Sequence, residues 1–141
     1  MTTIAEFAKK HRISMRVEWE HERPDGLHHQ WPQGSLHYRC TLRCLNTSKR
    51  MTVHFSQGPA HTKEPTISGV LSCLAADAAG WDNCGDFDAW ASEYGYLTGR
   101  YDNGEHKRIR KMYSLVERQA RALGRLLGDA YEELLYKTES E

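Results

Sequence analysis

The chain has 141 residues, of which 39% are hydrophobic, and it contains 19 basic and 19 acidic side chains. This length is sufficient for a single domain, over residues 1–141, whose core needs no disulfide or metal for stability. The neutral balance is unlike the overall basic excess of a general nucleic-acid binder, and no apolar run reaches the roughly 18 residues of a membrane-spanning helix.

Charge is unevenly distributed along the chain although it sums to zero. The net formal charge is +5 over residues 1–63, −7 over 64–105, +6 over 106–128 and −4 over 129–141. Two explanations fit this pattern: oppositely charged segments pair within the chain, or separate acidic and basic faces bind partners.

The N-terminal sequence and the cysteines both indicate the cytoplasm. Residues 1–12 are amphipathic and lack the apolar block and cleavage site of a secretory signal peptide. We therefore expect a cytoplasmic protein with no membrane partner, in which the cysteines stay reduced. The four cysteines are Cys40, Cys44, Cys73 and Cys84.

Residues 3–56 predict a short helix followed by a three-stranded sheet. Thr3 and Glu6 form a capping box at the start of a helix over residues 4–11. Apolar and polar residues then alternate in three stretches, which is typical of strands with one buried face. The apolar positions are Ile13, Met15, Val17 and Trp19, then Leu36, Tyr38, Cys40, Leu42 and Cys44, then Met51, Val53 and Phe55. The pattern predicts an antiparallel sheet with one wet face.

Residues 66–136 have helical periodicity instead. The first predicted helix has Thr66 as its cap, an apolar face that begins at Ile67, and Gly80 as its end. The stretch GWDNCGD is expected to form a turn before a short helix around DFDAWASEY. This second helix is expected to end at Gly95.

The longest predicted helix extends from Glu105 to Leu127, with an apolar stripe opposite a basic side. Gly128 is expected to break this helix and Asp129 to cap a final one. Helices of this kind would cover the apolar face of the sheet. The predicted fold class is therefore α+β, a three-stranded antiparallel sheet with helices packed on one face.

The cysteines and the eight histidines raise the question of a zinc site. On a strand, Cys40 and Cys44 would lie about 13 Å apart. That distance is too long for two ligands of one ion, so we interpret both as core residues. Cys73 and Cys84, with His61 or Asp77, are the remaining candidates, but they have no C-x-x-C or H-x-x-x-H spacing. We expect no metal site.

Catalytic motifs are missing from the sequence. No stretch matches a G-x-S-x-G nucleophile elbow, a Walker-type phosphate loop or a dinucleotide fingerprint. Ser56, His61 and Asp77 could meet in space, but a chain this polar offers such trios by chance. The sequence therefore predicts a protein that is not an enzyme and needs no cofactor, and a hydrolase is the least favoured hypothesis.

The stretch FSQGPAHTKEPT, residues 55–66, leads from the last predicted strand to the first long helix. Pro65 suits the start of a helix, so we interpret the stretch first as a connection. Alternatively it is a binding loop, in which His61 and Lys63 stand near first-turn N–H groups that can hold an anion.

Four stretches resemble a known group of proteins. The order GPAHTKEPT, VLSCLAADA, FDAWASEYGY and LLGDAYEELL resembles small proteins of unassigned function that phages, prophages and plasmids of bacteria carry. The resemblance extends over residues 36–136 and implies no catalytic residues. It implies a genomic setting in the bacterial host, that of accessory proteins which counter host defence, such as anti-CRISPR inhibitors.

We therefore expect a non-enzymatic protein that binds and inhibits a host defence protein or ribonucleoprotein complex through a protein–protein interface. Acidic side chains could imitate phosphates in front of a basic groove, and arginines of the long helix could bind an acidic surface. The candidate partner-binding residues are Asp82, Asp86, Asp88, Trp81, Lys111, Arg118, Arg121 and Arg125. A homodimer is also left open.

The alternative hypothesis is a small nucleic-acid-binding accessory factor. The basic face of the long C-terminal helix would contact phosphates together with outward residues of the sheet. Those sheet residues are Arg16, Arg39, Arg43 and His54. A solvated helix face that pairs with Glu117 and the acidic tail explains the helix charges without a ligand.

Overall fold

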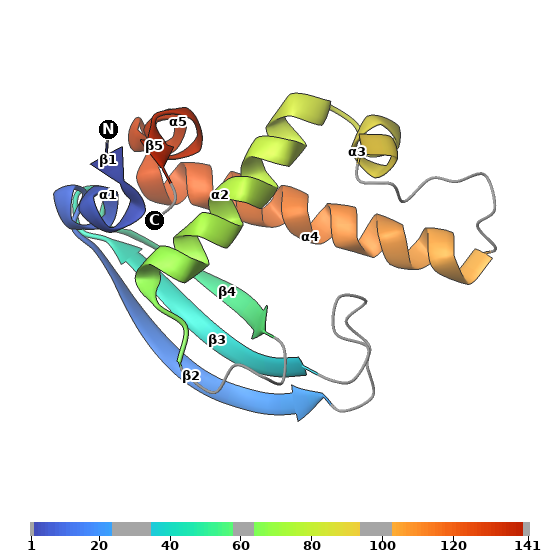
Figure 1. The fold of residues 1–141 in the computed structure, drawn as a ribbon, viewed down its shortest axis with the longest axis horizontal. Helices are drawn as coiled ribbons and strands as arrows, with labels where there is room; N and C mark the ends of the chain where they lie inside the picture. The colour runs from blue at the N-terminus through green and yellow to red at the C-terminus, as the bar shows by residue number, and fades with distance from the viewer. Residues whose placement is uncertain (1, 24–34, 58–63, 94–102, 140–141) are drawn as a thin grey trace.

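The computed structural model describes residues 2–23, 35–57, 64–93 and 103–139. It confirms the predicted α+β fold, in which a three-stranded antiparallel sheet has helices packed on one of its faces (Figure 1). In chain order the elements are β1 (Thr2–Thr3), α1 (Ile4–Lys10), β2 (Ile13–Arg23), β3 (Ser35–Cys44), β4 (Lys49–Gln57), α2 (Ile67–Cys84), α3 (Phe87–Glu93), α4 (Asn103–Leu127), α5 (Ala130–Tyr136) and β5 (Thr138–Glu139).

Strand β3 is the centre of the main sheet and pairs antiparallel with β2 and β4. Cys40 lies opposite Val17 of β2 and opposite Val53 of β4. Cys40, Leu42 and Cys44 are all buried on the same face, which confirms the alternation predicted for this strand. Both thiols are therefore core groups on an extended strand, as the spacing argument requires.

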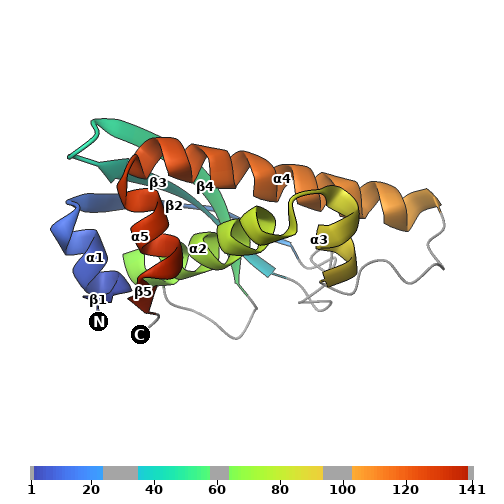
Figure 2. The same cartoon turned by 90° about the horizontal axis from the view of Figure 1, so that it is seen from above.

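Helices α1, α2, α4 and α5 form the main core with the inner face of the sheet. Figure 2 shows α2 beside α4, with α1 and α5 at one end of the pair and α3 at the other. The largest fully buried side chains of this core are Phe7, Leu42, Leu71, Leu123, Leu126 and Leu134. Burial of each such side chain contributes about 1.5–3 kcal/mol, so this core holds the helices on the inner face and leaves the outer face of the sheet open.

A second, smaller cluster joins α3 to the N-terminal half of α4. Its buried residues are Phe87, Trp90, Ala91 and Ile109. The ring of Tyr113 meets the rings of Phe87 and Trp90 edge-on, with centroids 5.6 and 5.5 Å apart. Trp90 is thus a core residue, and Tyr113 of the long helix packs within the chain.

Two helix starts have the caps that the sequence predicts. The Thr3 side chain accepts a hydrogen bond of 3.2 Å from the amide of Glu6. The Thr66 side chain accepts one of 3.0 Å from the amide of Gly69. Each bond satisfies a first-turn N–H group that has no partner inside its helix.

The predicted end of α2 is wrong. The helix does not stop at Gly80 but continues through Trp81 to Cys84, and it ends at Gly85, whose φ of 81° favours glycine. Trp81 packs against the main core. That burial outweighs the cost of one glycine inside a helix, about 1 kcal/mol. Most of the stretch GWDNCGD is therefore helical and not a turn.

The predicted cap of α5 is also wrong. Asp129 stands at the N-cap position, but its side chain makes no capping hydrogen bond and its backbone is helical, with φ −62° and ψ −21°. A capping side chain needs an extended backbone at this position. The chain turns instead at Gly128, with φ 59°, whose carbonyl accepts a bond of 3.1 Å from the amide of Tyr131.

A second sheet of two very short strands was not predicted. β1 and β5 pair in parallel, with Thr2 opposite Thr138. Two residues are too few to show a period in the sequence. Within the described ranges, no helix is both long enough and apolar enough to cross a membrane.

Candidate functional site

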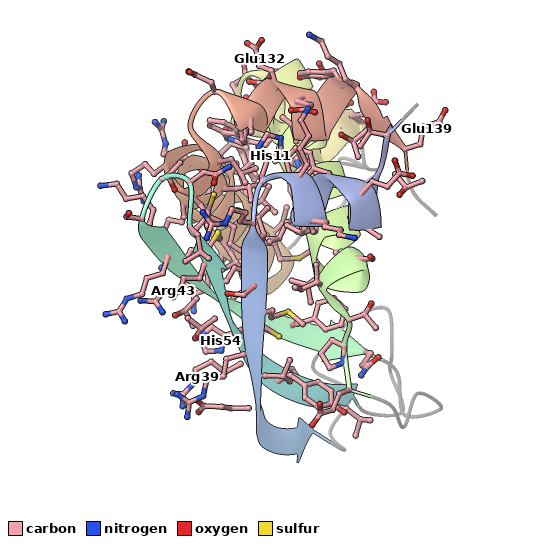
Figure 3. All side chains as sticks on the ribbon, turned by 90° about the vertical axis from the view of Figure 1, so that its left-hand side faces the viewer. His11, Arg39, Arg43, His54, Glu132 and Glu139 are labelled. Carbon is pink, nitrogen blue, oxygen red and sulfur yellow. The ribbon has the colours of Figure 1, made fainter. Side chains whose placement is uncertain are left out.

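The outer face of the main sheet is a polar surface that the helices leave uncovered. Figure 3 shows Arg39, Arg43 and His54 projecting from the sheet on the side away from α2. The described residues that share this face are Ser14, Arg16, Glu18, His37, Arg39, Thr41, Arg43, Arg50, Thr52, His54 and Ser56. These described residues include four arginines and one carboxylate, so this part of the face is basic although the chain is neutral.

Two of these arginines converge on the single carboxylate. The guanidinium of Arg39 on β3 donates a hydrogen bond to Glu18 on β2, directly opposite in the sheet. Arg16 lies two residues before Glu18, and its Nε is 3.4 Å from the other carboxylate oxygen. The hydrogen bond and charge of Arg39, with the charge of Arg16, lower the pKa of Glu18. The two guanidiniums are thus placed to hold one oxyanion between them.

The other two arginines face each other with no carboxylate between them. Arg43 of β3 and Arg50 of β4 are directly opposite in the register, and both are exposed. Neither makes an ion pair with a side chain in the described part of the protein. Like charges in this position destabilise a sheet. An anion bound between them would remove that repulsion.

Histidines and hydroxyls fill the rest of the face. Nδ1 of His37 and Oγ of Ser56 are 3.1 Å apart in a hydrogen bond between β3 and β4. His54 lies opposite Arg39, and Thr41 lies opposite Thr52. The face therefore offers donors for an anion over all three strands, and it also places one hydroxyl, that of Ser56, within hydrogen-bond reach of an imidazole, that of His37.

The arginines predicted on the long helix are all exposed, but two of them have partners within the chain. Nε of Arg118 donates to the carbonyl of Ser114 at 3.4 Å. Arg121 lies 3.6 Å from a carboxylate oxygen of Glu117, and its guanidinium stacks over the ring of Trp81 at 5.4 Å from the centroid. Lys111 and Arg125 are exposed on the same helix.

The predicted acidic residues lie near the C-terminal end of α2 and on α3. Asp82 accepts a hydrogen bond of 2.6 Å from the hydroxyl of Tyr136. Asp86 caps α3, accepting a bond of 2.8 Å from the amide of Ala89. Asp88 is exposed in the first turn of α3. Two of the three carboxylates thus have roles in the fold, which weakens the interpretation of this group as an imitation of phosphates.

Trp81 is less accessible than the sequence predicts, and Cys73 and Cys84 do not form a metal site together. Trp81, predicted in a loop, is half-buried against the main core. Cys73 and Cys84 stand on one helix. Eleven residues of helix separate them by about 16 Å, so they cannot share an ion. Burial first, then the charge of Asp77, raises the pKa of the Cys73 thiol, which favours its protonated form.

His61 and Lys63, the predicted binding loop, lie outside the described residues. Among the residues that are described, no group of three His, Cys, Asp or Glu side chains could hold a metal ion.

Sequence reasoning missed two polar arrangements. Arg50 could have been found, because the alternation that turns Met51 inward also turns its neighbour outward. The second arrangement joins α1 to α5: Lys10 Nζ and His11 Nε2 each lie 2.8 Å from an oxygen of Glu133. These groups are far apart in the sequence and no local pattern links them.

The fold and this face together define a class: a small α+β protein with an open, arginine-rich sheet. Comparisons of the chain with protein-family models, with curated proteins and with solved structures gave no match.

Proposed function

We propose that the protein binds nucleic acid through the outer face of its sheet, with the arginines of β2, β3 and β4 on the phosphates. The observation that carries the proposal is the opposed pair Arg43 and Arg50, exposed and without a carboxylate among the described residues. A fold that tolerates such repulsion gains from an anionic ligand. Guanidinium groups suit phosphate because they donate two parallel hydrogen bonds to it.

The neutral net charge does not oppose this proposal. Local potential and not the sum over the chain attracts a polyanion, and several of the acidic residues that balance the chain lie away from the sheet, among them Asp82 of α2, Asp88 of α3 and Glu132 of α5. The expectation of an accessory protein that inhibits a host ribonucleoprotein complex is compatible with it, since such a complex contains RNA. That partner stays a proposal.

The test is a binding titration over several salt concentrations. Fluorescence anisotropy of a labelled nucleic acid should give an affinity that falls steeply with salt, with a logarithmic slope of about −0.9 per phosphate contact for duplex DNA. The double variant R43Q/R50Q should make the slope smaller by about two contacts. Arg118→Gln, on the exposed side of α4, is the matched control and should bind like the parent protein.

A second candidate function uses α4 as a protein-binding surface. Leu115 is 41% exposed and lies between Lys111 and Arg118 on the same side of the helix. An apolar side chain flanked by cations suits a partner protein with an acidic rim. If Arg118→Gln and Leu115→Ala abolish capture of a partner from a bacterial host while R43Q/R50Q does not, this second candidate replaces the first.

A further inference from the structure

The composition of the outer sheet face bears on which form of nucleic acid it would bind. Proteins that hold single strands stack the bases on several aromatic rings. In the described part of this sheet, Tyr38 and Phe55 turn inward: Tyr38 is buried, and Phe55 packs against the main core. His54 is exposed, but His37 is half-buried and bonded to Ser56. The one exposed ring among the described residues of this face does not make a stacking platform.

The spacing of the arginines fits two rows of phosphates. Arg39 and Arg43 are four residues apart on β3, which corresponds to about 13 Å. Arg39 belongs with Arg16 to one pair, and Arg43 forms the other pair with Arg50. The grooves of B-DNA are about 6 and 12 Å wide. With their long side chains, the two pairs can therefore reach the two backbones that border one groove.

The width of the sheet does not suit insertion of its three strands into a major groove. A major groove admits one helix or a two-stranded ribbon, whereas three strands at about 4.8 Å spacing with side chains on both edges are wider. Arginine can pair with guanine, but the described outer residues include no Asn or Gln, the side chains that pair with adenine. The hydroxyls of Ser14, Thr41 and Thr52 are instead suited to phosphate and sugar oxygens.

We infer that the ligand of this face is the sugar–phosphate backbone of a double-stranded nucleic acid, contacted without sequence preference. The inference rests on the proposed function and adds the form of the ligand. DNA and RNA duplexes share the chemistry that the face recognises, two rows of phosphates that border a groove.

The test compares four labelled probes of equal length, about 15 nucleotides or base pairs, with the full-length protein at low salt. The probes are two DNA duplexes of unrelated sequence, a single strand of one of them, and an RNA duplex. We expect the two DNA duplexes to bind within about twofold of each other and the single strand at least about fivefold more weakly. Comparison of the RNA duplex with the DNA duplexes shows which nucleic acid is preferred. Tight binding of either the DNA duplexes or the RNA duplex supports the inference.

Three results would overturn it. Equal or tighter binding of the single strand would exclude a duplex ligand while leaving the proposed function in place. A difference of more than about tenfold between the two DNA sequences would exclude backbone recognition, since a single mismatched contact is worth about 1–3 kcal/mol. Lack of binding to all four probes would remove both the inference and the proposed function. If any probe binds, the variants R43Q/R50Q and Arg118→Gln show whether that binding is on the sheet or on α4.

Discussion

Arg43 and Arg50 lie directly opposite each other on neighbouring strands, both exposed. Their repulsion should lower the free energy of unfolding. If the face binds phosphate, the bound ligand should remove this loss. Arg50→Glu replaces the repulsion by an attractive cross-strand pair, so we expect the free energy of unfolding to rise by about 0.2–1 kcal/mol. Affinity for nucleic acid should fall at the same time. Urea unfolding and anisotropy measure the two effects.

In this prediction the free energy of unfolding rises while the affinity for nucleic acid falls. A variant that loses both stability and affinity would indicate a folding defect, and Arg50 would then have a structural role. Arg118→Glu, on α4, serves as the control and should change neither quantity by more than about 0.5 kcal/mol.

Glu18 should act as an internal competitor for the ligand. Its lowered pKa keeps it charged at neutral pH, where it occupies Arg39 and Arg16. Glu18→Gln keeps the shape and removes the charge, so we expect nucleic acid to bind about two- to fivefold more tightly at low salt. Anisotropy measures the gain.

Glu117→Gln is the matched control for that experiment, because Glu117 also pairs with an arginine, Arg121, but on α4. It should leave the affinity unchanged. Weaker binding by Glu18→Gln would mean that the carboxylate positions Arg39 for the ligand and does not compete with it.

Two tyrosines of α5 should respond in opposite ways to loss of the hydroxyl. The hydroxyl of Tyr131 is buried and has no hydrogen-bond partner within the described structure, so Tyr131→Phe should stabilise the protein by about 1 kcal/mol. The hydroxyl of Tyr136 donates to Asp82, which raises the pKa of Tyr136 to about 12. Tyr136→Phe should therefore be neutral or slightly destabilising. Thermal unfolding of both variants at pH 7 compares them, and a loss of stability in Tyr131→Phe would show that a bound water or other group satisfies its hydroxyl.

Glu133 should make stability depend on pH in the acid range. Hydrogen bonds from Lys10 and then His11 lower its pKa in the folded protein. Its contribution is thus fully present above the unfolded pKa of about 4.3 and is lost as the pH falls through the lower folded value. We expect Glu133→Gln to cost about 1 kcal/mol at pH 7 and progressively less below pH 4.

Glu132→Gln is the control for this experiment, because Glu132 is the exposed neighbour of Glu133 and forms no ion pair within the described residues. Urea unfolding at several pH values follows the three proteins. A difference between parent and Glu133→Gln that stays constant from pH 7 to pH 3 would contradict the assignment.

Most of the fold could be predicted because its elements have clear periods. The alternation around Cys40 and the helical spacing after Thr66 each reflect one buried face. Gly80 misled the prediction, since a glycine inside a helix and one that ends it look alike until packing is known. Only tertiary contacts could reveal the pairing of Thr2 with Thr138, which has no pattern of its own.

The candidate site could be predicted only in part. Periodicity already places Arg39 and Arg43 on the wet face, but it does not say which residue of β4 lies opposite Arg43. That depends on the register, which the turn at residues 45–48 determines, with Ser48 at a positive φ of 59°. The role of Asp82 likewise depends on a group brought near by the fold, the hydroxyl of Tyr136.

The small cluster of α3 on α4 divides the long helix into two parts of unequal support. Its C-terminal half is anchored in the main core through Leu123 and Leu126, whereas its N-terminal half relies on Ile109 and the few rings of α3. Segments with so little buried area open first. Amide protons near Ile109 should therefore exchange with solvent sooner than those near Leu123, and α3 with the first turns of α4 should be able to detach and reclose while the sheet and its arginines stay in place.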